Sequence, residues 1–409
     1  MEIVKDKGFW NSGHKPTLFS AFLYFDMSFM VWVLIGPLAV IMMNDYPMTA
    51  IQKANLVALP VLGGSLLRLV FGFLTDYIGP KRTGQFGLLA TMVPLVWGWQ
   101  FVDSLNHLYI VALLLGFAGA SFAAALPLAS RWYPPQYQGL AMGIAGAGNS
   151  GTVFSTLFAN RLATHFGGWE TVFGLALIPI GIVFIVFTVF AKESPTQPAP
   201  KKLSQYASVL KKRDTWLFCL MYGVTFGGFV GLTNYLTIFF NAQYGVSAVR
   251  AADFTTICVI AGSFFRPVGG YLSDKIGGIR MLIVLYAAAG LLFLTISSLP
   301  PLAVVIPLLF LAMMSLGTGN GAVFQLIPQR FGADIGLLTG IVGAAGGFGG
   351  YLLPLLLGSL YGKTGSYTPG FITMACIALG ALVALSIVQG VWKRTWLSPD
   401  GRAKLEAEA

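Results

Sequence analysis

The sequence predicts an all-α membrane protein with about twelve transmembrane helices in two pseudo-symmetric six-helix bundles, and three observations support that fold class. Only 10% of the 409 residues are charged and 56% are hydrophobic, whereas a soluble domain carries roughly 25% charged residues. Long apolar runs recur along the chain, and its second half repeats motifs of the first. The net charge of +10 is explained by basic loops that orient a membrane protein, so we expect no nucleic-acid partner.

Twelve apolar segments account for most of the chain. The longer runs approach or exceed the ~20 residues that a helix needs to cross a bilayer. No small-residue cleavage site follows the first run, so we expect a retained span and not a signal peptide. The expected spans are residues 17–43, 52–75, 83–102, 107–131, 137–163, 168–190, 214–241, 250–273, 279–298, 301–330, 335–362 and 367–391.

The distribution of basic residues predicts the orientation. With the N-terminus in the cytoplasm, the cytoplasmic segments hold 19 Lys and Arg residues and the opposite side holds four. Cytoplasmic loops carry such an excess, so we expect a multi-pass protein of the cell membrane with both termini in the cytoplasm. Two arginines remain, Arg68 and Arg266, and both lie inside expected spans.

The longest polar stretch divides the spans into two groups of six. It runs from Ala191 to Arg213, is Pro-rich at first and basic afterwards, and is expected to be a cytoplasmic linker with a short surface helix near residues 203–210. The predicted organisation is an N-terminal bundle at 1–190, a linker at 191–213, a C-terminal bundle at 214–392 and a cytoplasmic tail at 393–409.

An internal repeat supports this division. RLVFGFLTDYIGPKR at residues 68–82 matches RPVGGYLSDKIGGIR at 266–280 with an offset of 198. The glycine motif Gly139–Gly151 is echoed by Gly336–Gly350, and the starts of these two segments are offset by 197. Two parallel six-helix halves, related by an axis along the membrane normal, are typical of major facilitator carriers.

Both copies of the first repeat resemble the loop motif of the major facilitator fold. Its aspartate can cap a helix or pair with basic residues, and so hold the cytoplasmic side closed. The motif does not indicate the substrate, because carriers of very different substrates share it. The gating residues that the two copies predict are Gly72, Asp76, Lys81, Arg82, Gly270, Asp274 and Arg280.

Arg68 and Arg266 predict an anion site. Each lies eight residues before the loop aspartate, about 12 Å along a helix, so both are near the midplane of a hydrocarbon core ~30 Å thick. Equal depth in two pseudo-symmetric halves suggests that they face each other. A buried arginine costs at least ~2.5–3.5 kcal/mol and cannot be deprotonated. The alternative is an arginine that snorkels or pairs with an acid, but the one acid well inside a span is Asp26, which cannot neutralise both.

Two guanidinium groups suit a small planar oxyanion. Each presents several N–H donors in one plane, and the oxygens of nitrate or nitrite match that geometry, whereas lysine would supply charge without the planar fit. Nitrate also stays anionic at physiological pH, as a permanently cationic site requires.

Several segments resemble the nitrate/nitrite porter family of the major facilitator superfamily. GIAGAGNSG at residues 143–151 is similar to that family's span-5 glycine motif, and the Gly-rich span 11 to its second copy. GTGNGAVFQLIP at 317–328 is similar to the family's span 10, and spans 1 and 4 fit as well. The resemblance covers nearly the whole chain, and the paired arginines together with both glycine motifs make it specific.

The resemblance implies a role for particular side chains. Arg68 and Arg266 would clamp the anion, Asn149 would hydrogen-bond it, Tyr222 would act as a donor, and Phe226 and Phe122 would form opposite apolar walls. Ordinary helix packing or lipid contact is the alternative for each aromatic residue. No cofactor or metal is implied, and we expect a monomer.

The glycines of spans 5 and 11 predict close approach of helices. Small residues at three- and four-residue spacing let helix backbones pack closely, and they also let helices slide, which a carrier needs. The helix-packing glycines expected here are Gly143, Gly146, Gly148, Gly151, Gly340, Gly343, Gly346 and Gly347.

Asp26 is the candidate for proton coupling. It lies about ten residues into span 1 between Phe25 and Met27, and an intramembrane carboxyl group is a functional candidate by default. The alternative is a fixed partner for Asn, Tyr or one arginine. Exchange of nitrate for nitrite and symport of nitrate with protons both remain open.

Other functions are distinguished by what the spans contain. The nearest alternative is a carrier of the same fold for formate, oxalate or a small organic phosphate. A membrane enzyme would need a cluster of catalytic His, Ser or carboxylate groups within the spans, and a nitrate sensor would usually carry a soluble signalling domain. Neither feature is present in the sequence, so we expect no enzyme. The three cysteines, Cys219, Cys258 and Cys376, fall inside apolar spans and are expected to be packing residues.

Overall fold

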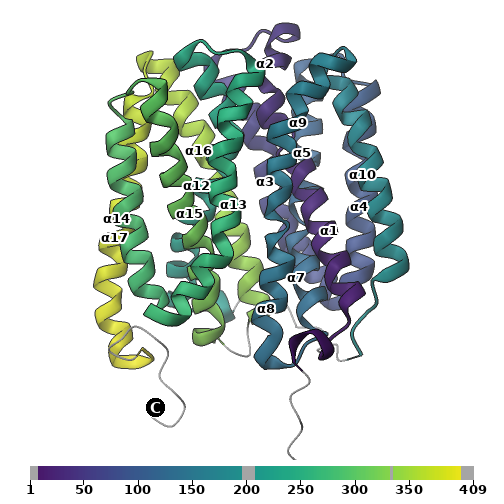
Figure 1. Ribbon diagram of the computed structural model, residues 1–409, viewed down its shortest axis with the longest axis vertical. Helices are drawn as coiled ribbons and strands as arrows, with labels where there is room; N and C mark the ends of the chain where they lie inside the picture. The colour runs from purple at the N-terminus through teal and green to yellow at the C-terminus, as the bar shows by residue number, and fades with distance from the viewer. Residues whose placement is uncertain (1–7, 196–207, 332–334, 398–409) are drawn as a thin grey trace, which may run out of the picture.

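The computed structural model describes residues 8–195, 208–331 and 335–397, and every regular element within those ranges is a helix (Figure 1). The N-terminal half consists of η1 (Phe9–Asn11), α1 (Lys15–Trp32), α2 (Ile35–Asp45), α3 (Ala50–Tyr77), α4 (Pro80–Gln100), α5 (Leu105–Leu114), α6 (Gly116–Gly119), α7 (Phe122–Ser130), α8 (Pro135–Gly146), η2 (Ala147–Ser150), α9 (Gly151–Phe166) and α10 (Trp169–Phe190). The C-terminal half consists of α12 (Arg213–Tyr244), α13 (Ala248–Ile276), α14 (Gly278–Ile296), α15 (Leu302–Phe331), α16 (Ile335–Thr364) and α17 (Thr368–Thr395).

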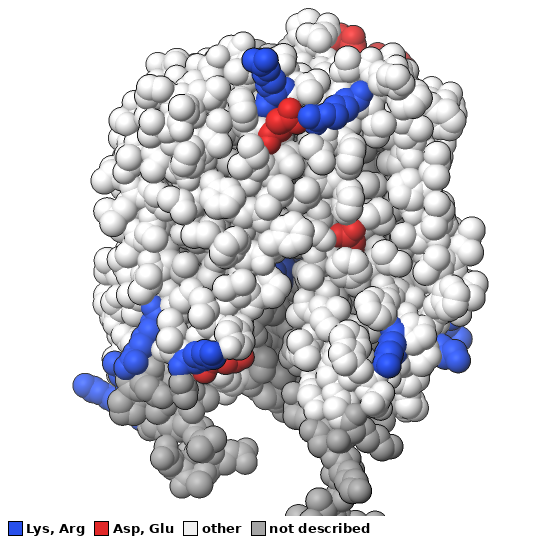
Figure 2. All heavy atoms as spheres, in the orientation of Figure 1, with Lys and Arg blue, Asp and Glu red and all other residues white. Residues whose placement is uncertain are grey.

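The helices of the described residues cross the molecule twelve times, which confirms the predicted fold class. Within the described ranges, ten helical segments are long and apolar enough to span a membrane. The remaining two crossings are α4 and the α8–η2–α9 segment, and the latter is rich in Gly, Ser and Thr because it carries the first glycine motif. On the face seen in Figure 2, charged side chains gather toward the two ends of the molecule and leave a nearly uncharged band between them.

Helix α1 begins and helix α17 ends on the same side of the bundle (Figure 1). We call the side at which α1 begins and α17 ends the terminal face, and the other side the opposite face. The expected linker helix near residues 203–210 lies mostly outside the described residues, although residues 208–210 are helical.

Three of the crossings are interrupted, and local chemistry explains where. Pro37 lacks the N–H that would bond to the carbonyl of Val33, and that carbonyl instead accepts a hydrogen bond from the Gly36 N–H at 3.2 Å; α1 therefore ends and α2 begins there. The fourth crossing breaks into α5, α6 and α7 within a stretch of small residues. The fifth contains the 3₁₀ turn η2, which carries Asn149.

The two halves contact each other on the opposite face and at mid-depth. Arg161 on α9 forms an ion pair of 2.6 Å with Asp253 on α13, and the nearby Asn160 amide donates to the carbonyl of Ala248 at 3.0 Å. Gly36 on α2 lies against the backbone of Asn234 on α12. These contacts close the opposite face.

Near the terminal face, the polar contacts that we identify between described side chains stay within one half. Arg131 pairs with Asp76 at 2.9 Å in the N-terminal half, and Arg330 pairs with Asp214 at 2.6 Å in the C-terminal half. Figure 2 shows a cleft that enters between the halves from this face, with Lys or Arg atoms visible at its inner end. The molecule is therefore open toward the terminal face.

Candidate functional site

Arg68 and Arg266 hold corresponding positions on corresponding helices, α3 and α13. Their side chains are buried, with 1% and 8% of the residue surface exposed. The Arg68 Nε donates to the carbonyl of Gly119 at 3.0 Å, and its Nη1 donates to the carbonyl of Gly343 at 2.7 Å. Because Gly119 belongs to the N-terminal half and Gly343 to the C-terminal half, Arg68 bridges the two halves.

Both arginines lie over one aromatic ring. The guanidinium carbon of Arg68 is 5.2 Å from the centroid of the Phe122 ring, and that of Arg266 is 5.8 Å from the same centroid. The two guanidinium carbons are therefore at most about 11 Å apart, the sum of those distances. Because each N–H···O hydrogen bond spans about 2.9 Å, this upper limit on their separation is compatible with contact of both groups to one small anion.

No carboxylate neutralises these charges in the part of the chain that the structure describes. Neither arginine takes part in a salt bridge there. Asp26 is buried on α1, and its Oδ1 accepts a hydrogen bond of 2.6 Å from the Ser150 hydroxyl. The partner of Asp26 is thus a serine and not one of the arginines.

Aromatic rings surround the guanidinium of Arg68. Its central carbon is 4.9 Å from the ring centroid of Phe226 on α12 and 5.0 Å from that of Trp32 on α1. Ring faces attract a cation through their quadrupole but carry no net charge. They hold the guanidinium in place while its positive charge stays available to a substrate.

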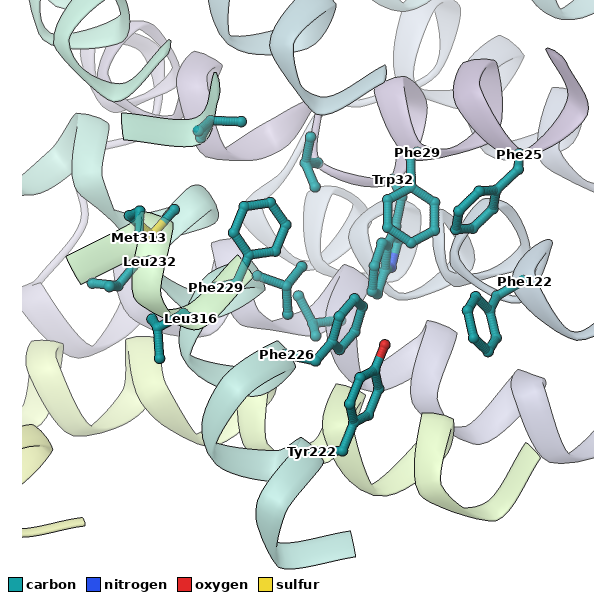
Figure 3. Packing of buried hydrophobic residues seen from close by; sticks show 14 of the residues in the cluster. Phe25, Phe29, Trp32, Phe122, Tyr222, Phe226, Phe229, Leu232, Met313 and Leu316 are labelled. Carbon is teal, nitrogen blue, oxygen red and sulfur yellow. The ribbon is translucent and has the colours of Figure 1, made fainter. Parts of the chain in front are cut away.

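The aromatic wall continues through Tyr222 and Phe324. Tyr222 stacks on Phe226 with ring centroids 4.9 Å apart, and its ring meets that of Phe324 edge-on at 4.8 Å. Phe324 on α15 also lies 5.5 Å from Phe122 and 5.5 Å from the Arg266 guanidinium carbon. Figure 3 shows the Tyr222 hydroxyl directed into the space bordered by Phe226, Trp32 and Phe122.

Several buried polar atoms in this region have no hydrogen-bond partner among the described residues. They are Nη2 of Arg68, Nη1 of Arg266, the hydroxyl of Tyr222 and both amide atoms of Asn149. Buried polar groups in proteins are normally paired, because each unpaired one loses the hydrogen bonds it made to water. Apart from the Asn149 oxygen, each of these groups can donate a hydrogen bond. A bound anion would accept those hydrogen bonds.

Asn149 is positioned by glycines at its sides. Gly148 and Gly151 lie against the backbone of Asp26, and a Cβ at either would collide with it. The small residues therefore let η2 approach α1 closely. Tight packing of this 3₁₀ turn fixes the backbone that carries the Asn149 amide.

Two serines link the arginine-bearing helices to the opposite halves. Ser263, three residues before Arg266, donates from its hydroxyl to the carbonyl of Asn149 at 3.3 Å. Ser65, three residues before Arg68, donates to the carbonyl of Ala344 on α16. These serines are related by the same offset of 198 as the arginines. Each arginine thus lies one helical turn from a contact with the Gly-rich segment of the other half.

The loop motif joins elements within each half. Asp76 pairs with Arg131 at the end of the fourth crossing, and Asp274 accepts a hydrogen bond of 2.9 Å from the Gln325 amide on α15. The Glu193 carboxylate accepts a hydrogen bond of 2.8 Å from the backbone N–H of Lys81. With the terminal face open, these contacts stabilise each half separately.

The predicted packing glycines divide into two groups. Gly346 lies against the Tyr222 ring, Gly347 lies against Ser65, and Gly343 lies near Phe122. Together with Gly148 and Gly151, these glycines are at positions where helices or side chains meet closely. Gly143 and Gly340 do not: a Cβ at either would meet nothing within 4 Å, and at Gly146 it would meet just one atom, 3.8 Å away. Close packing is therefore not observed at Gly143 and Gly340, which lie nearer the terminal face, where the halves are apart.

The sequence did not single out two aromatic residues that the structure brings into the site. Phe324 lies in the span-10 segment that resembles the porter family, but nothing distinguished it from other phenylalanines. Trp32 donates its Nε1 hydrogen to the carbonyl of Pro60 on α3 at 2.6 Å, a contact that no local pattern predicts.

Comparisons with known proteins show the family of the chain. The family model described as Major Facilitator Superfamily matches residues 18–336. The "Nitrite extrusion protein" of Bacillus subtilis is 32% identical over 356 residues, which cover 87% of this chain and 89% of the relative. A "Probable nitrate/nitrite transporter" of Mycobacterium tuberculosis is 33% identical over 362 residues, or 87% of this chain and 91% of the relative. The crystal structure of a bacterial homologue of the human lysosomal transporter Spinster, 18% identical, matches with a TM-score of 0.66 and covers 95% of this chain and 98% of the other.

Proposed function

Because the chain belongs to the Major Facilitator Superfamily, and within it to the family of nitrate and nitrite transporters, we propose that it moves nitrate and/or nitrite across the cytoplasmic membrane by alternating access. The observation that carries this proposal is the pair of buried arginines, one from each half, over the shared ring of Phe122 with no acid paired to either among the described residues.

In this proposal the anion lies between the two guanidinium groups and is sandwiched by aromatic rings. Arg68 and Arg266 donate planar N–H groups to its oxygens, while the Tyr222 hydroxyl and the Asn149 amide donate from the sides. Phe122 and Phe226 keep water out, which strengthens each electrostatic contact. A single chain supplies every one of these groups, so we propose that the monomer is the transport unit.

The orientation follows from charge. We propose that the terminal face lies in the cytoplasm, a proposal supported by the 19 basic residues of its segments against four on the opposite side. The open cleft of Figure 2 then faces inward. We propose that the bundles at 1–190 and 214–392 rock against each other, with the segment 191–213 as the linker. Opening the other side requires the Arg161–Asp253 pair to separate.

Energy coupling is restricted by the membrane potential. Entry of one negative charge against an inside-negative potential costs ~2.3 kcal/mol per 100 mV, so uniport would carry nitrate out of the cell. Exchange for nitrite is electroneutral, as is symport with one proton. An empty site holds two uncompensated charges, which disfavours closing apolar helices over it. Substrate is therefore expected to speed reorientation, as in an exchanger.

Uptake into proteoliposomes tests the function. Labelled nitrate is expected to accumulate when the vesicles contain nitrite, and competition by formate, oxalate and small organic phosphates distinguishes the nearest alternative substrates. If one of those anions competes and nitrite does not, the substrate assignment is wrong although the carrier fold stands.

Proton coupling, if present, is expected to depend on Asp26. The Asp26→Asn variant keeps a hydrogen-bond partner for Ser150 but cannot bind a proton, so we expect it to lose pH-driven nitrate uptake while nitrate–nitrite exchange stays within about twofold of the wild type. Uptake is measured in proteoliposomes with the pH gradient and the internal nitrite varied separately. Ser150→Ala is the matched control, because it removes the same hydrogen bond and leaves the carboxyl group. Proton-driven uptake that survives in Asp26→Asn would exclude this residue from coupling.

A further inference from the structure

We propose that Asn320 on α15 is a further anion-contacting residue, the amide by which the C-terminal half complements Asn149 of the N-terminal half. This inference rests on the proposed transport of nitrate or nitrite. It starts from the hydrogen bonding of asparagines inside the membrane-spanning region and then locates Asn320 relative to Arg266 and Tyr222.

Four asparagines are fully or almost fully buried in the described ranges, and they fall into two pairs. Asn160 and Asn234 donate their amide N–H groups to the carbonyls of Ala248 and Val230 at 3.0 and 2.9 Å. Asn149 and Asn320 differ, because neither the nitrogen nor the oxygen of either amide has a partner among described residues. An amide that served helix packing would use a nearby carbonyl as the first pair does. The Asn320 amide is therefore buried and unpaired, like the amide of Asn149 in the candidate site.

Neighbouring residues on α15 show which way Asn320 faces. Leu316, four residues earlier, lies against Gly228 of α12. Gly317, three residues earlier, lies against Gly262 of α13. Residues three and four positions apart share a helix face, so Asn320 faces the groove between α12 and α13, one turn closer to the terminal face.

At that depth the groove contains the candidate site. On α13, Arg266 is one turn from Gly262, and the α15 backbone at Gly321 lies against the Arg266 carbonyl. On α12, Gly319 lies against Thr225, and Phe324, one turn beyond Asn320, packs on Tyr222. Asn320 is thus flanked by the helices that carry Arg266 and Tyr222, both of which have unpaired buried donors.

Pseudo-symmetry agrees with this location. The offset of 198 that relates Arg68 to Arg266 and Ser65 to Ser263 also relates Phe122 to Asn320. Phe122 is the ring over which both arginines lie. By this offset the aromatic ring of the N-terminal half corresponds to an amide in the C-terminal half.

The chemistry of an amide suits this surrounding. Its oxygen can accept from the Arg266 guanidinium or the Tyr222 hydroxyl, which are donors, and that orientation leaves the NH₂ group to donate to an oxyanion. A carboxylate at the same place would accept but not donate, and it would repel the substrate. An amide is therefore expected to bind the anion where a carboxylate of similar size is not.

Binding of nitrate to the purified full chain tests the proposal, measured by isothermal titration calorimetry. Asn320→Leu, similar in shape but without donors, is expected to weaken nitrate binding at least tenfold, and Asn320→Asp to abolish it. Asn234→Ala is the matched control, since it removes a buried amide away from the arginines and is expected to stay within threefold of the wild type. If the leucine variant does not elute as folded protein, Asn320→Ala takes its place under the same criterion.

The outcomes separate this inference from the function on which it rests. Wild-type protein that binds neither nitrate nor nitrite would refute the proposed function and this inference with it. Wild-type binding together with a change below threefold in Asn320→Leu would overturn the role of Asn320 alone. An equal loss in Asn234→Ala would also overturn it, because the effect would then follow from removing any buried amide.

Discussion

Replacing Arg68 or Arg266 by lysine is expected to reduce nitrate transport by about 100-fold or more, which corresponds to about 2.8 kcal/mol. Lysine keeps the charge but loses the planar fork. At Arg68 it also loses the geometry that donates to the carbonyls of Gly119 and Gly343 at the same time. Transport is measured as counterflow of labelled nitrate in proteoliposomes, with the amount of folded protein checked by size-exclusion chromatography and thermal melting.

An Arg→Lys substitution on the opposite face serves as the control for the effect of exchanging arginine for lysine away from the candidate site. Arg161→Lys makes the same exchange of residue type at the partly exposed ion pair with Asp253, far from the candidate site in sequence, and lysine keeps the charge that pairs across the opposite face. Exposed pairs contribute only ~0.2–1 kcal/mol, so this variant is expected to transport within about threefold of the wild type. Near-normal counterflow in Arg68→Lys and Arg266→Lys would rule out a site built on two guanidinium forks.

A disulfide between Ala50→Cys and Gly362→Cys is expected to stop transport completely, and a reductant is expected to restore it. Ala50 begins α3 in the N-terminal half and Gly362 is near the end of α16 in the C-terminal half. A Cβ at Gly362 would lie 3.5 Å from the Ala50 Cβ, within the range that a disulfide needs. The bond would hold the opposite face closed, so the anion could enter and leave from the terminal face but could not cross.

The cross-link needs a background without reactive native thiols. Cys219 and Cys258 are buried, but Cys376 is exposed on α17, contrary to the packing role expected for it, and should be replaced by serine. Each single-cysteine variant is expected to transport normally under oxidising and reducing conditions. Counterflow that continues through a fully cross-linked pair, as judged by mobility on a denaturing gel, would show that the halves do not separate on this side during transport.

Much of the fold and the charged centre could be predicted because their signals are strong and local. Apolar runs, the basic-residue bias and the repeat predicted twelve crossings. The depth of Arg68 and Arg266 followed from their distance to the loop aspartates, because a helix advances by a constant rise per residue. Both arginines meet at Phe122 as their equal depth suggested.

The remainder could not be predicted because it depends on helix rotation and on contacts between distant segments. The ring of Phe324 packs on Tyr222, but phenylalanine also faces lipid on many helices here, and a single sequence does not tell the two apart. The partner of Asp26 proved to be Ser150, 124 residues later. Gly143 and Gly340 meet nothing within 4 Å, since contacts there depend on which face of the carrier is closed.

If the two halves rock as proposed, the hydroxyl contacts of Ser65 and Ser263 predict an axis of motion at the depth of the two arginines. Each joins a helix of one half to a carbonyl of the other, one turn from an arginine. Rotation about an axis displaces nearby atoms least. Rocking of the halves would therefore move the terminal face and the opposite face by large distances, whereas the side chains proposed to bind the anion would move little. The affinity for nitrate should then be nearly equal from either side of the membrane, which suits a carrier whose direction is set by the gradients of the anions it exchanges.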